Sequence, residues 1–348
     1  MKPIKVALAG FGAGGRIYNA PIIASVEALR ITKILTSSPE NIKAAKRDLP
    51  KASLVKDFTE ILEDSEIDLV VITTPNQLHR EYAEKALKAG KHVVVEKPIT
   101  PTVKEAEVLI KLAQENGRIL SVNHNRRWDS DIRTIKRILE EKRLGEVVEY
   151  EAHFDRFRPE LKDSWKENKE NAGNGILYDL GSHLIDQTLW LFGFPEEVFA
   201  DLRIQRENSE VVDNFELLLF YPGLKITLKA GMMVKEPGPR YQVFGRKGCF
   251  RKWGMDVQEE ALKKGIHPKD RTDWGVEPED IWGKISSPSG DETIQSERGD
   301  YRKFYENIVA SIRGEENLEV TPQQASNVIR IIELAIRSNS EKRVLPTN

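Results

Sequence analysis

Short runs of β-branched residues alternate with longer helix-compatible segments between residues 4 and 122. This alternation predicts a parallel sheet wound with crossover helices, because neighbouring parallel strands need a long return connection. Helices are expected at 78–89 and 103–116, each followed by a glycine (Gly90, Gly117) that suits the left-handed C-cap conformation. The expected strands, apolar enough to be buried on both faces, cover residues 4–9, 31–36, 53–55, 69–73, 92–95 and 119–122.

After Asn123 the pattern changes, and strands follow one another with only turns between them. Pro222 and Gly223 separate two such strands and suit a tight reversal, which predicts a mostly antiparallel sheet. Thr321 is the expected N-cap of the last helix. The expected elements are a helix at 129–142, strands at 147–154, 215–221 and 225–231, and closing helices at 301–312 and 323–337.

Two patterns of this kind predict two domains, since 348 residues exceed one core of ordinary size. We expect a doubly wound α/β domain over residues 1–122 and an α+β domain over residues 123–348. The segment 253–299 is rich in Gly, Pro and charge, but its tryptophans predict an ordered loop with buried anchors rather than disorder. These tryptophans are Trp253, Trp274 and Trp282.

Composition restricts the partners of the chain. The formal charge of −2 comes from 53 basic and 55 acidic side chains that are interspersed, which gives no footprint for nucleic acid. No apolar run is long enough for a membrane helix, and the start of the chain does not resemble a secretion signal. Cys249 is the only cysteine, so a reducing cytoplasm is expected. The expected partner is a small molecule.

A glycine-rich segment, Gly10-Phe11-Gly12-Ala13-Gly14-Gly15, follows the first expected strand and precedes an expected helix. In that context the GxGxxG spacing predicts a dinucleotide site of the Rossmann type. Glycines permit a sharp turn, a close approach of the backbone to a pyrophosphate and tight packing of helix on strand. We expect Gly10, Phe11, Gly12 and Gly15 to line the cofactor; a glycine-rich turn without a ligand is the alternative.

The second strand indicates which dinucleotide binds. An acidic residue about 20 residues beyond the glycines usually binds the adenosine ribose, but here the strand ends at Thr36-Ser37-Ser38. Without a carboxylate to repel a 2′-phosphate, and with hydroxyl donors at Ser37 and Ser38, NADP is favoured over NAD. The alternative is that the two serines only cap the helix that carries Lys43 and Arg47.

Three side chains suit hydride-transfer chemistry. Lys97 follows the strand at 92–95, at the edge where doubly wound sheets place their ligands. Asp179 and His183 are four residues apart at the expected start of a helix, so they share a face. Histidine can take a hydroxyl proton, lysine can stabilise an alkoxide and the aspartate can orient the imidazole. The alternatives are a solvated lysine, a core histidine, or a metal site with Asp186 that lacks further ligands.

These motifs together resemble those of the Gfo/Idh/MocA oxidoreductase family, over essentially the whole chain. The resemblance implies that Lys97 is catalytic, that His183 is the acid/base and that Asp179 is its partner. It also implies a large open sheet in the C-terminal domain that mediates homodimers or homotetramers and completes a substrate site. Along the cofactor it places Thr74, Pro75, Asn76, His79, Glu96 and Lys97, from the Thr74-Pro75-Asn76 run and the Glu96-Lys97-Pro98 motif.

Within that family, the segments at 123–129, 153–159 and 274–278 resemble the branch that contains NADP-dependent scyllo-inositol dehydrogenases. The expected reaction is oxidation of a secondary alcohol of a cyclic polyol or sugar to a ketone. A sensor that binds cofactor without turning it over, and a dehydrogenase of another sugar, are the alternatives. A polyhydroxylated ring needs several fixed polar contacts, for which the candidates are Arg127, His153, Asp155 and Asp186; each could equally be structural.

Overall fold

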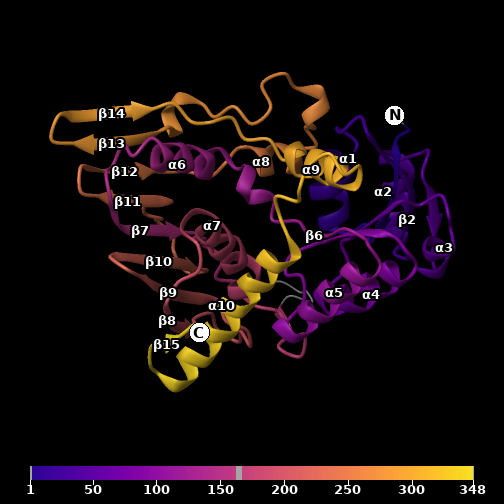
Figure 1. The fold of residues 1–348 in the computed structure, drawn as a ribbon, viewed down its shortest axis with the longest axis horizontal. Coiled ribbons are helices and arrows are strands. Elements are labelled where there is room, and N and C mark those ends of the chain that lie inside the picture. Colours follow the sequence, from indigo (N-terminus) through magenta and orange to yellow (C-terminus); the bar gives the residue numbers. More distant parts are fainter. Residues whose placement is uncertain (1, 162–166, 348) are drawn as a thin grey trace. The chain divides into compact units, whose positions relative to one another are not determined.

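The computed structural model describes residues 2–161 and 167–347 (Figure 1). These residues form two compact units. Two late segments belong with the N-terminal residues in the first unit, and the domain boundary expected after residue 122 stays a prediction. The first unit comprises Met1–Asn125, Gln258–Trp274 and Asp300–Ser326; the second comprises Arg126–Val257, Gly275–Gly299 and Asn327–Asn348.

Six parallel strands form the sheet of the first unit, in the order β3-β2-β1-β4-β5-β6. The predicted doubly wound sheet is therefore confirmed, and the strand boundaries differ from the expected ones by at most two residues. Central strands such as β4 are buried along their whole length, as expected for a sheet covered on both faces. The strands are β1 (Ile4–Ala9), β2 (Leu29–Leu35), β3 (Ser53–Val55), β4 (Leu69–Ile72), β5 (His92–Val95) and β6 (Leu120–Val122).

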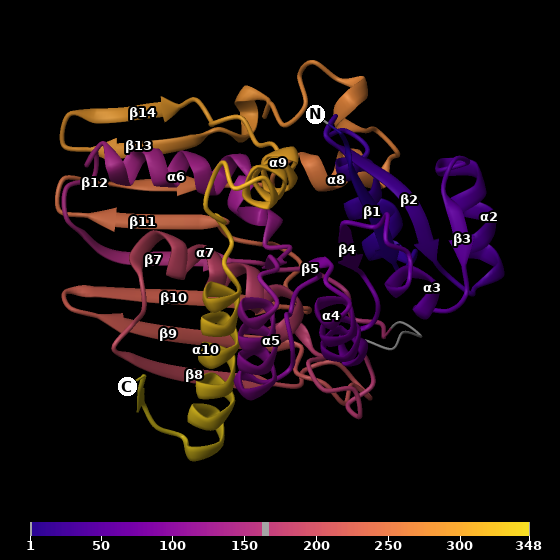
Figure 2. The same cartoon turned by 45° about the vertical axis from the view of Figure 1, so that its right-hand side comes forward.

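Crossover helices connect these strands, and Figures 1 and 2 show α4 and α5 side by side. Gly90 and Gly117 follow these two helices with φ of 73° and 57°, which confirms the predicted left-handed C-caps. Thr102 caps α5 by accepting a hydrogen bond from the Glu105 N–H. The helices are α1 (Ala20–Ile23), α2 (Pro39–Asp48), α3 (Thr59–Leu62), α4 (His79–Lys88) and α5 (Val103–Glu115).

The second unit contains a nine-stranded sheet in the order β14-β13-β12-β11-β7-β10-β9-β8-β15. Only β7 and β10 pair in parallel, so the prediction of a mostly antiparallel sheet is confirmed. The strands are β7 (Val147–His153), β8 (Glu197–Arg203), β9 (Asn214–Tyr221), β10 (Leu224–Gly231), β11 (Tyr241–Gly245), β12 (Gly248–Lys252), β13 (Gly283–Ser287), β14 (Gly290–Ile294) and β15 (Leu345–Pro346).

One face of this sheet is covered by helices. Along β9, Phe215, Leu217 and Leu219 are buried and alternate with half-exposed residues, which is the period expected for a sheet with one packed face. Figure 2 shows α6 (Ser130–Glu140), α7 (Ser182–Phe192) and the later part of α10 (Pro322–Glu341) in front of the strands. In the described part of the chain, no helix is seen over the other face of these strands (Figures 1 and 2).

The segment 253–299 is ordered, as predicted, but sequence reasoning missed its helix and its hairpin. It contains α8 (Gln258–Lys263) and the pair β13–β14. Trp274 is 3% exposed and its indole N–H donates to Gln258, so it is a buried anchor. Trp253 is 47% exposed, so its expected role as an anchor is wrong.

A buried ion pair joins this segment to the sheet of the second unit. The Lys252 ammonium lies 2.9 Å from the Glu277 carboxylate, and both side chains are fully buried. Lys252 also donates to the Ile281 carbonyl, and Ser296 donates to Glu277. Because a buried charge without a partner is expensive, loss of either residue alone is expected to cost about 3–5 kcal/mol.

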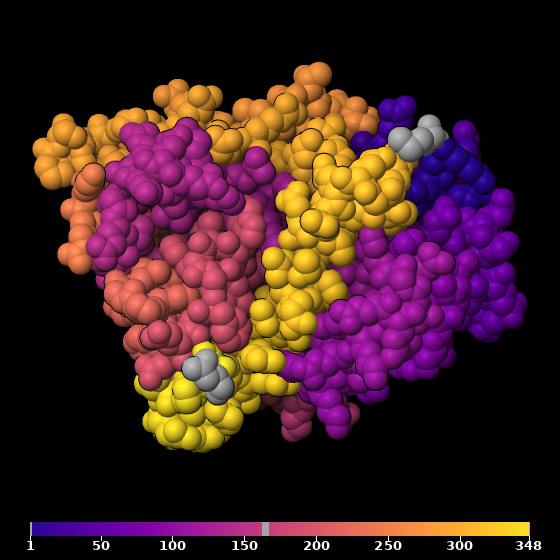
Figure 3. Space-filling model, viewed as in Figure 1, coloured from indigo at the N-terminus to yellow at the C-terminus, as the bar shows by residue number. Residues whose placement is uncertain are grey.

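The chain ends in two helices, α9 (Arg302–Ile312) and α10. Thr321 caps α10, since its hydroxyl accepts from the Gln324 N–H and the Gln324 side chain accepts from the Thr321 N–H. The yellow surface of α10 shows that one side of this helix faces solvent (Figure 3). Within residues 2–161 and 167–347, no helix is long and apolar enough to cross a membrane.

His92 makes stability depend on pH. Its Nδ1 accepts a hydrogen bond from the Ile119 N–H, and burial lowers the pKa of His92 from 6.5 to about 4. Between these two pH values, the unfolded chain therefore binds a proton at His92 more readily than the folded chain does. The contribution of the neutral ring to the free energy of unfolding is lost as pH falls through this range. Because the ring is partly exposed, we expect the free energy of unfolding to fall by roughly 1–2 kcal/mol from pH 7 to pH 4.5.

Urea unfolding of the His92→Asn variant, in which the amide oxygen can still accept from Ile119, should show less of this pH dependence. His267→Asn, at a half-exposed histidine, is the control and should retain it. Equal pH dependence in the wild type and the His92 variant would contradict the assignment.

Candidate functional site

The glycine loop lies directly after β1, where the chain turns sharply. Gly10 has φ of 110°, and a Cβ there would lie 2.9 Å from the Thr73 carbonyl oxygen. A Cβ on Gly15 would lie 2.4 Å from the Gly10 carbonyl oxygen, so this position also requires glycine. Gly12, in contrast, has no atom within 4 Å of its Cβ position. The loop is thus packed tightly inward and open at Gly12, which fits a backbone cradle for a pyrophosphate.

The helix expected after this loop is present but irregular. Gly14–Asn19 forms a π-helical segment, and Ala20–Ile23 forms a short α-helix. Phe11 is 1% exposed and packs into the core of the first unit. The Arg16 N–H donates to the Gly12 carbonyl oxygen at 2.8 Å, which closes the loop on itself.

Ser37 and Ser38 are exposed at the end of β2, next to the buried Thr36. Ser38 occupies the N-cap position of α2, yet its side chain makes no capping hydrogen bond. Ser38 is therefore the N-cap residue of α2 by its position, without a capping bond from its hydroxyl. Arg47, on α2, binds the neighbouring Asp48 carboxylate at 2.6 Å.

His79 joins two loops of the first unit. Its imidazole is fully buried, with Nδ1 2.8 Å from the Pro98 carbonyl oxygen and Nε2 3.0 Å from the Thr74 carbonyl oxygen. Burial lowers the pKa of His79, and the two carbonyl oxygens act in the opposite direction. The structure thus links the segment Thr74-Pro75-Asn76, which follows β4, with the segment Glu96-Lys97-Pro98, which follows β5.

Lys97 is half-exposed immediately after β5, at the carboxyl end of the strand. Its N–H donates to the preceding Glu96 carboxylate, which also accepts hydrogen bonds from the buried Asn19 and Asn123. Sequence reasoning missed Asn19, because no motif marks it; Asn123 was noted only as part of a longer segment. A cation at this edge can stabilise an oxygen that gains negative charge.

Asp179 and His183 lie in the second unit, where the expected regular helix start is wrong. Leu177–Gly181 is a π-helical segment, and α7 begins at Ser182. Asp179 therefore lies in the wider π turn and His183 in the first turn of the α-helix. Such π segments are frequent at functional sites. His183 is buried, with 8% of its surface exposed, and the Leu184 and Ile185 that follow it are completely buried.

Two of the candidate substrate residues pair with each other. The Arg127 guanidinium binds the Asp186 carboxylate through two hydrogen bonds, of 2.9 Å and 2.6 Å, and each side chain is 3% exposed. Charge-assisted bonds in this paired geometry fix both side chains. Asp186 follows His183 by three residues on α7, so the pair lies one turn from the imidazole along the helix.

The other two candidates also pair. His153 Nδ1 lies 3.3 Å from the Asp155 carboxylate, and Asp155 accepts a hydrogen bond from the Gly231 N–H. His153, the last residue of β7, lies in the chain between Ala152 and Phe154, which are both buried. It therefore lies on the opposite face of the strand from these two residues.

Gln187 was missed by sequence reasoning, although it holds α7 in place. Its side-chain amide donates to the Arg126 carbonyl oxygen at 2.8 Å and accepts from the Tyr241 hydroxyl at 2.9 Å. Gln187 and Tyr241 are fully or almost fully buried. The helix that carries His183 and Asp186 is thereby tied to strand β11.

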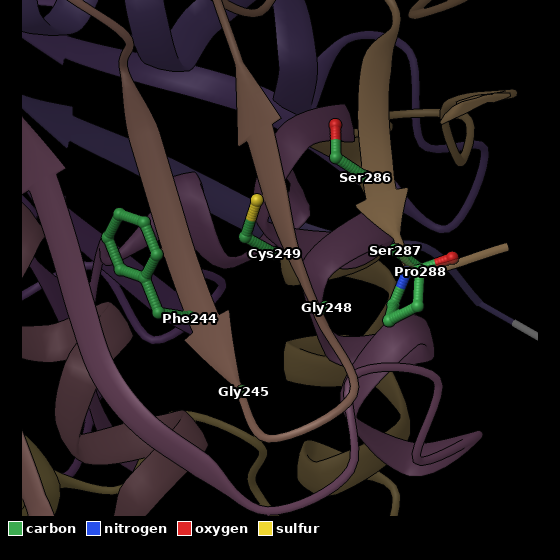
Figure 4. Close-up of a pocket in the computed structure, with 7 residues that line it drawn as sticks. All are labelled: Phe244, Gly245, Gly248, Cys249, Ser286, Ser287 and Pro288. Atoms are coloured by element: carbon green, nitrogen blue, oxygen red, sulfur yellow. The ribbon is translucent and has the colours of Figure 1, made fainter. Parts of the chain in front are cut away.

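A hollow of about 350 Å³ lies on the second unit, away from these residues. Figure 4 shows the residues around it: Phe244, Cys249 and Ser286 lie on the neighbouring strands β11, β12 and β13, and Pro288 lies in the turn after β13. None of the candidate site residues is among those that line it. In the described part of the chain, no group of three or more His, Cys, Asp or Glu side chains is arranged to hold a metal ion.

Comparison with known proteins identifies the family. Residues 4–124 match the NAD-binding Rossmann fold of the Gfo/Idh/MocA oxidoreductases, and residues 136–347 match their C-terminal alpha/beta domain. The chain belongs to this family. It is therefore an oxidoreductase, and its first sheet is that of an NAD-binding Rossmann domain, as the glycine loop predicted.

Similar proteins match along nearly the full chain. Scyllo-inositol 2-dehydrogenase (NADP(+)) IolW of Bacillus subtilis is 44% identical, over 98% of this chain and 95% of its own. The Escherichia coli oxidoreductase YdgJ, which is uncharacterised, is 40% identical, over 98% of both chains. The crystal structure of Bacillus subtilis YvaA superimposes with a TM-score of 0.94 at 44% identity, covering 99% of this chain and 98% of that one.

The glycine loop gives a matched pair of substitutions. Gly12→Ala adds a methyl group where the loop is open, so the free protein should keep its melting temperature while dinucleotide affinity falls about tenfold or more. Gly15→Ala places the methyl group against the Gly10 carbonyl oxygen and should destabilise the free protein by roughly 1–3 kcal/mol. Thermal melts and fluorescence titration with NADPH measure the two effects. Unchanged NADPH affinity in the folded Gly12 variant would contradict a cradle at this loop.

Proposed function

We propose that the chain transfers a hydride between a secondary alcohol of a cyclic polyol and the nicotinamide of NADP, with scyllo-inositol and its keto form as the substrate pair. The similarity to IolW along almost the full length of both chains carries this proposal. The uncharged end of β2, with exposed Ser37 and Ser38, supports NADP over NAD because a 2′-phosphate meets no carboxylate there.

The cofactor would be held in the first unit. The backbone of the loop from Gly10 to Gly15 would hold the pyrophosphate, and Ser37 and Ser38 the adenosine end. The rest of the cofactor would be lined by the two connected loops at the carboxyl ends of β4 and β5. These loops contain Thr74, Pro75, Asn76, His79 and Glu96. When bound, the nicotinamide accepts the hydride from the alcohol carbon or returns it to the ketone.

The chain's own residues would manage the proton and the charge on oxygen. His183 takes the hydroxyl proton onto a ring nitrogen as the C–H bond breaks, and Asp179 keeps the imidazole oriented for this transfer. The Lys97 ammonium stabilises the negative charge that develops on the same oxygen. In the reverse direction His183 returns the proton. Two pairs would bind the other hydroxyl groups of the ring, Arg127 with Asp186 and His153 with Asp155. In each pair the basic side chain fixes the carboxylate.

We further propose a cytoplasmic homodimer or homotetramer. The single Cys249 suits a reducing compartment. The face of the nine-stranded sheet without helices carries the half-exposed Phe199, Leu218 and Phe220, which would be covered in an assembly formed through this face.

A substrate panel tests the proposed reaction. Purified protein with NADP⁺ or NAD⁺ should reduce the nicotinamide, followed by absorbance, with scyllo-inositol giving the highest kcat/KM among inositol isomers and aldoses. NADP⁺ should be preferred over NAD⁺ by roughly tenfold or more in kcat/KM. Tight NADPH binding with no turnover on any compound would instead favour a sensor, and turnover confined to aldoses would assign another sugar.

Lys97→Ala tests the assigned chemistry. Removal of the cation should lower kcat by about 10²–10⁴-fold, while NADPH affinity stays within about threefold of wild type. Lys111→Ala, at a lysine whose side chain is 77% exposed on α5, is the control and should leave turnover unchanged. Turnover near wild type in the Lys97 variant would overturn the assignment.

A further inference from the structure

A buried hydrogen-bond network surrounds the Glu96 carboxylate in the first unit. One carboxylate oxygen, Oε1, accepts from the Asn19 side chain at 2.6 Å and from the Asn123 side chain at 2.8 Å. The other, Oε2, accepts from the Lys97 N–H at 3.2 Å. Asn19 is completely buried and Asn123 is 3% exposed. The carboxylate is therefore fixed by donors from three separate segments of the chain.

Tyr305 completes this network from helix α9. Its hydroxyl donates to Asn19 Oδ1 at 2.5 Å, across 286 positions of sequence. Burial, reinforced by the negative charge of Glu96, raises the pKa of Tyr305 well above its ordinary value. The hydroxyl therefore keeps its proton and always acts as a donor to Asn19.

The hydrogen bonds leave Asn19 a single orientation. Its amide nitrogen faces two acceptors, Glu96 and the Gly14 carbonyl oxygen, the latter at 2.9 Å. Its amide oxygen faces two donors, Tyr305 and Asn123. Rotation of the Asn19 amide by half a turn would place its oxygen against the Glu96 carboxylate and its nitrogen against the two donors. Asn19 thus ties the glycine loop, through Gly14, to the segment that carries Lys97.

We propose that Asn19, Asn123 and Tyr305 are positioning residues that fix Glu96 and, through its bond to the Lys97 N–H, the backbone that carries the Lys97 ammonium. This inference rests on the proposed role of Lys97 in turnover. A lysine side chain has high rotational freedom, so control of its backbone limits where its charge can lie. Misplacement of a reacting group by about 1 Å can cost about 10²-fold in rate.

Tyr305→Phe removes a single oxygen atom and is the first test. We expect kcat to fall roughly 5- to 30-fold, while KM for the alcohol and the Kd for NADPH stay within about threefold. In the protein without cofactor, amide hydrogen exchange of peptides covering 10–20 and 93–100 should be faster by roughly tenfold. Tyr150→Phe is the control, because this buried hydroxyl of the second unit makes no hydrogen bond to any residue that the structure describes. Its kcat and its exchange rates in both peptides should equal those of the wild type.

A double-mutant cycle tests the route through Glu96. In a Glu96→Ala background, Tyr305→Phe should have almost no further effect on kcat or on exchange in 93–100, because the connection is already broken. Asn19→Asp, which keeps the acceptor for Tyr305 but sets a carboxylate against Glu96, should lower kcat further than Tyr305→Phe. Circular dichroism confirms that each variant is folded.

Unchanged kcat and exchange in folded Tyr305→Phe and Asn19→Asp, or additive effects in the cycle, would overturn the inference. The exchange measurement does not depend on turnover. If Lys97→Ala retains full activity while Tyr305→Phe still speeds exchange in 93–100, the proposed role of Lys97 fails and the connection through Asn19 and Glu96 remains.

Discussion

The parallel direction of all six strands in the first sheet is the constraint on which the candidate site depends. Because the strands run the same way, the segments that follow them all begin at one edge of the sheet. Gly10, Thr36, Thr73, Glu96 and Asn123 are separated widely in sequence but follow β1, β2, β4, β5 and β6 respectively. The topology alone therefore gathers a backbone cradle, hydroxyl groups, a carboxylate and amide donors. Contacts within the unit then only need to orient what the strands have already brought together.

The elements that sequence patterns predicted well are those with strong local signals. Every strand of the first sheet was expected, because each is a compact β-branched run, and Gly90, Gly117 and Thr321 marked helix ends through local backbone chemistry. Strand β8 and the short strands β11 to β15 were missed; β14, for example, has Ile294 as its one buried residue, so it carries little apolar pattern. Their pairing depends on partners along the sheet rather than on local periodicity.

Candidate residues could be named from the sequence, but their partners could not. Arg127 and Asp186 lie 59 residues apart, and nothing local indicates that they form a buried pair. Asn19 and Tyr305 carry no motif at all, and their contact arises because α9 packs within the first unit. The irregular π segments at Gly14–Asn19 and Leu177–Gly181 were likewise expected as ordinary helix, because helical periodicity does not distinguish a π turn from an α turn over five or six residues.

The buried pair of Lys252 and Glu277 limits how this chain can change over time. Replacing one partner by an apolar residue leaves the other charged in a dry interior, whereas replacing both can cost little. During evolution, this pair can therefore be replaced only through an intermediate protein of much lower stability, or through two simultaneous substitutions. A hybrid enzyme that receives the segment 275–299 from a relative must consequently also receive the residue at position 252 that matches it, even though the two positions lie in separate stretches of sequence.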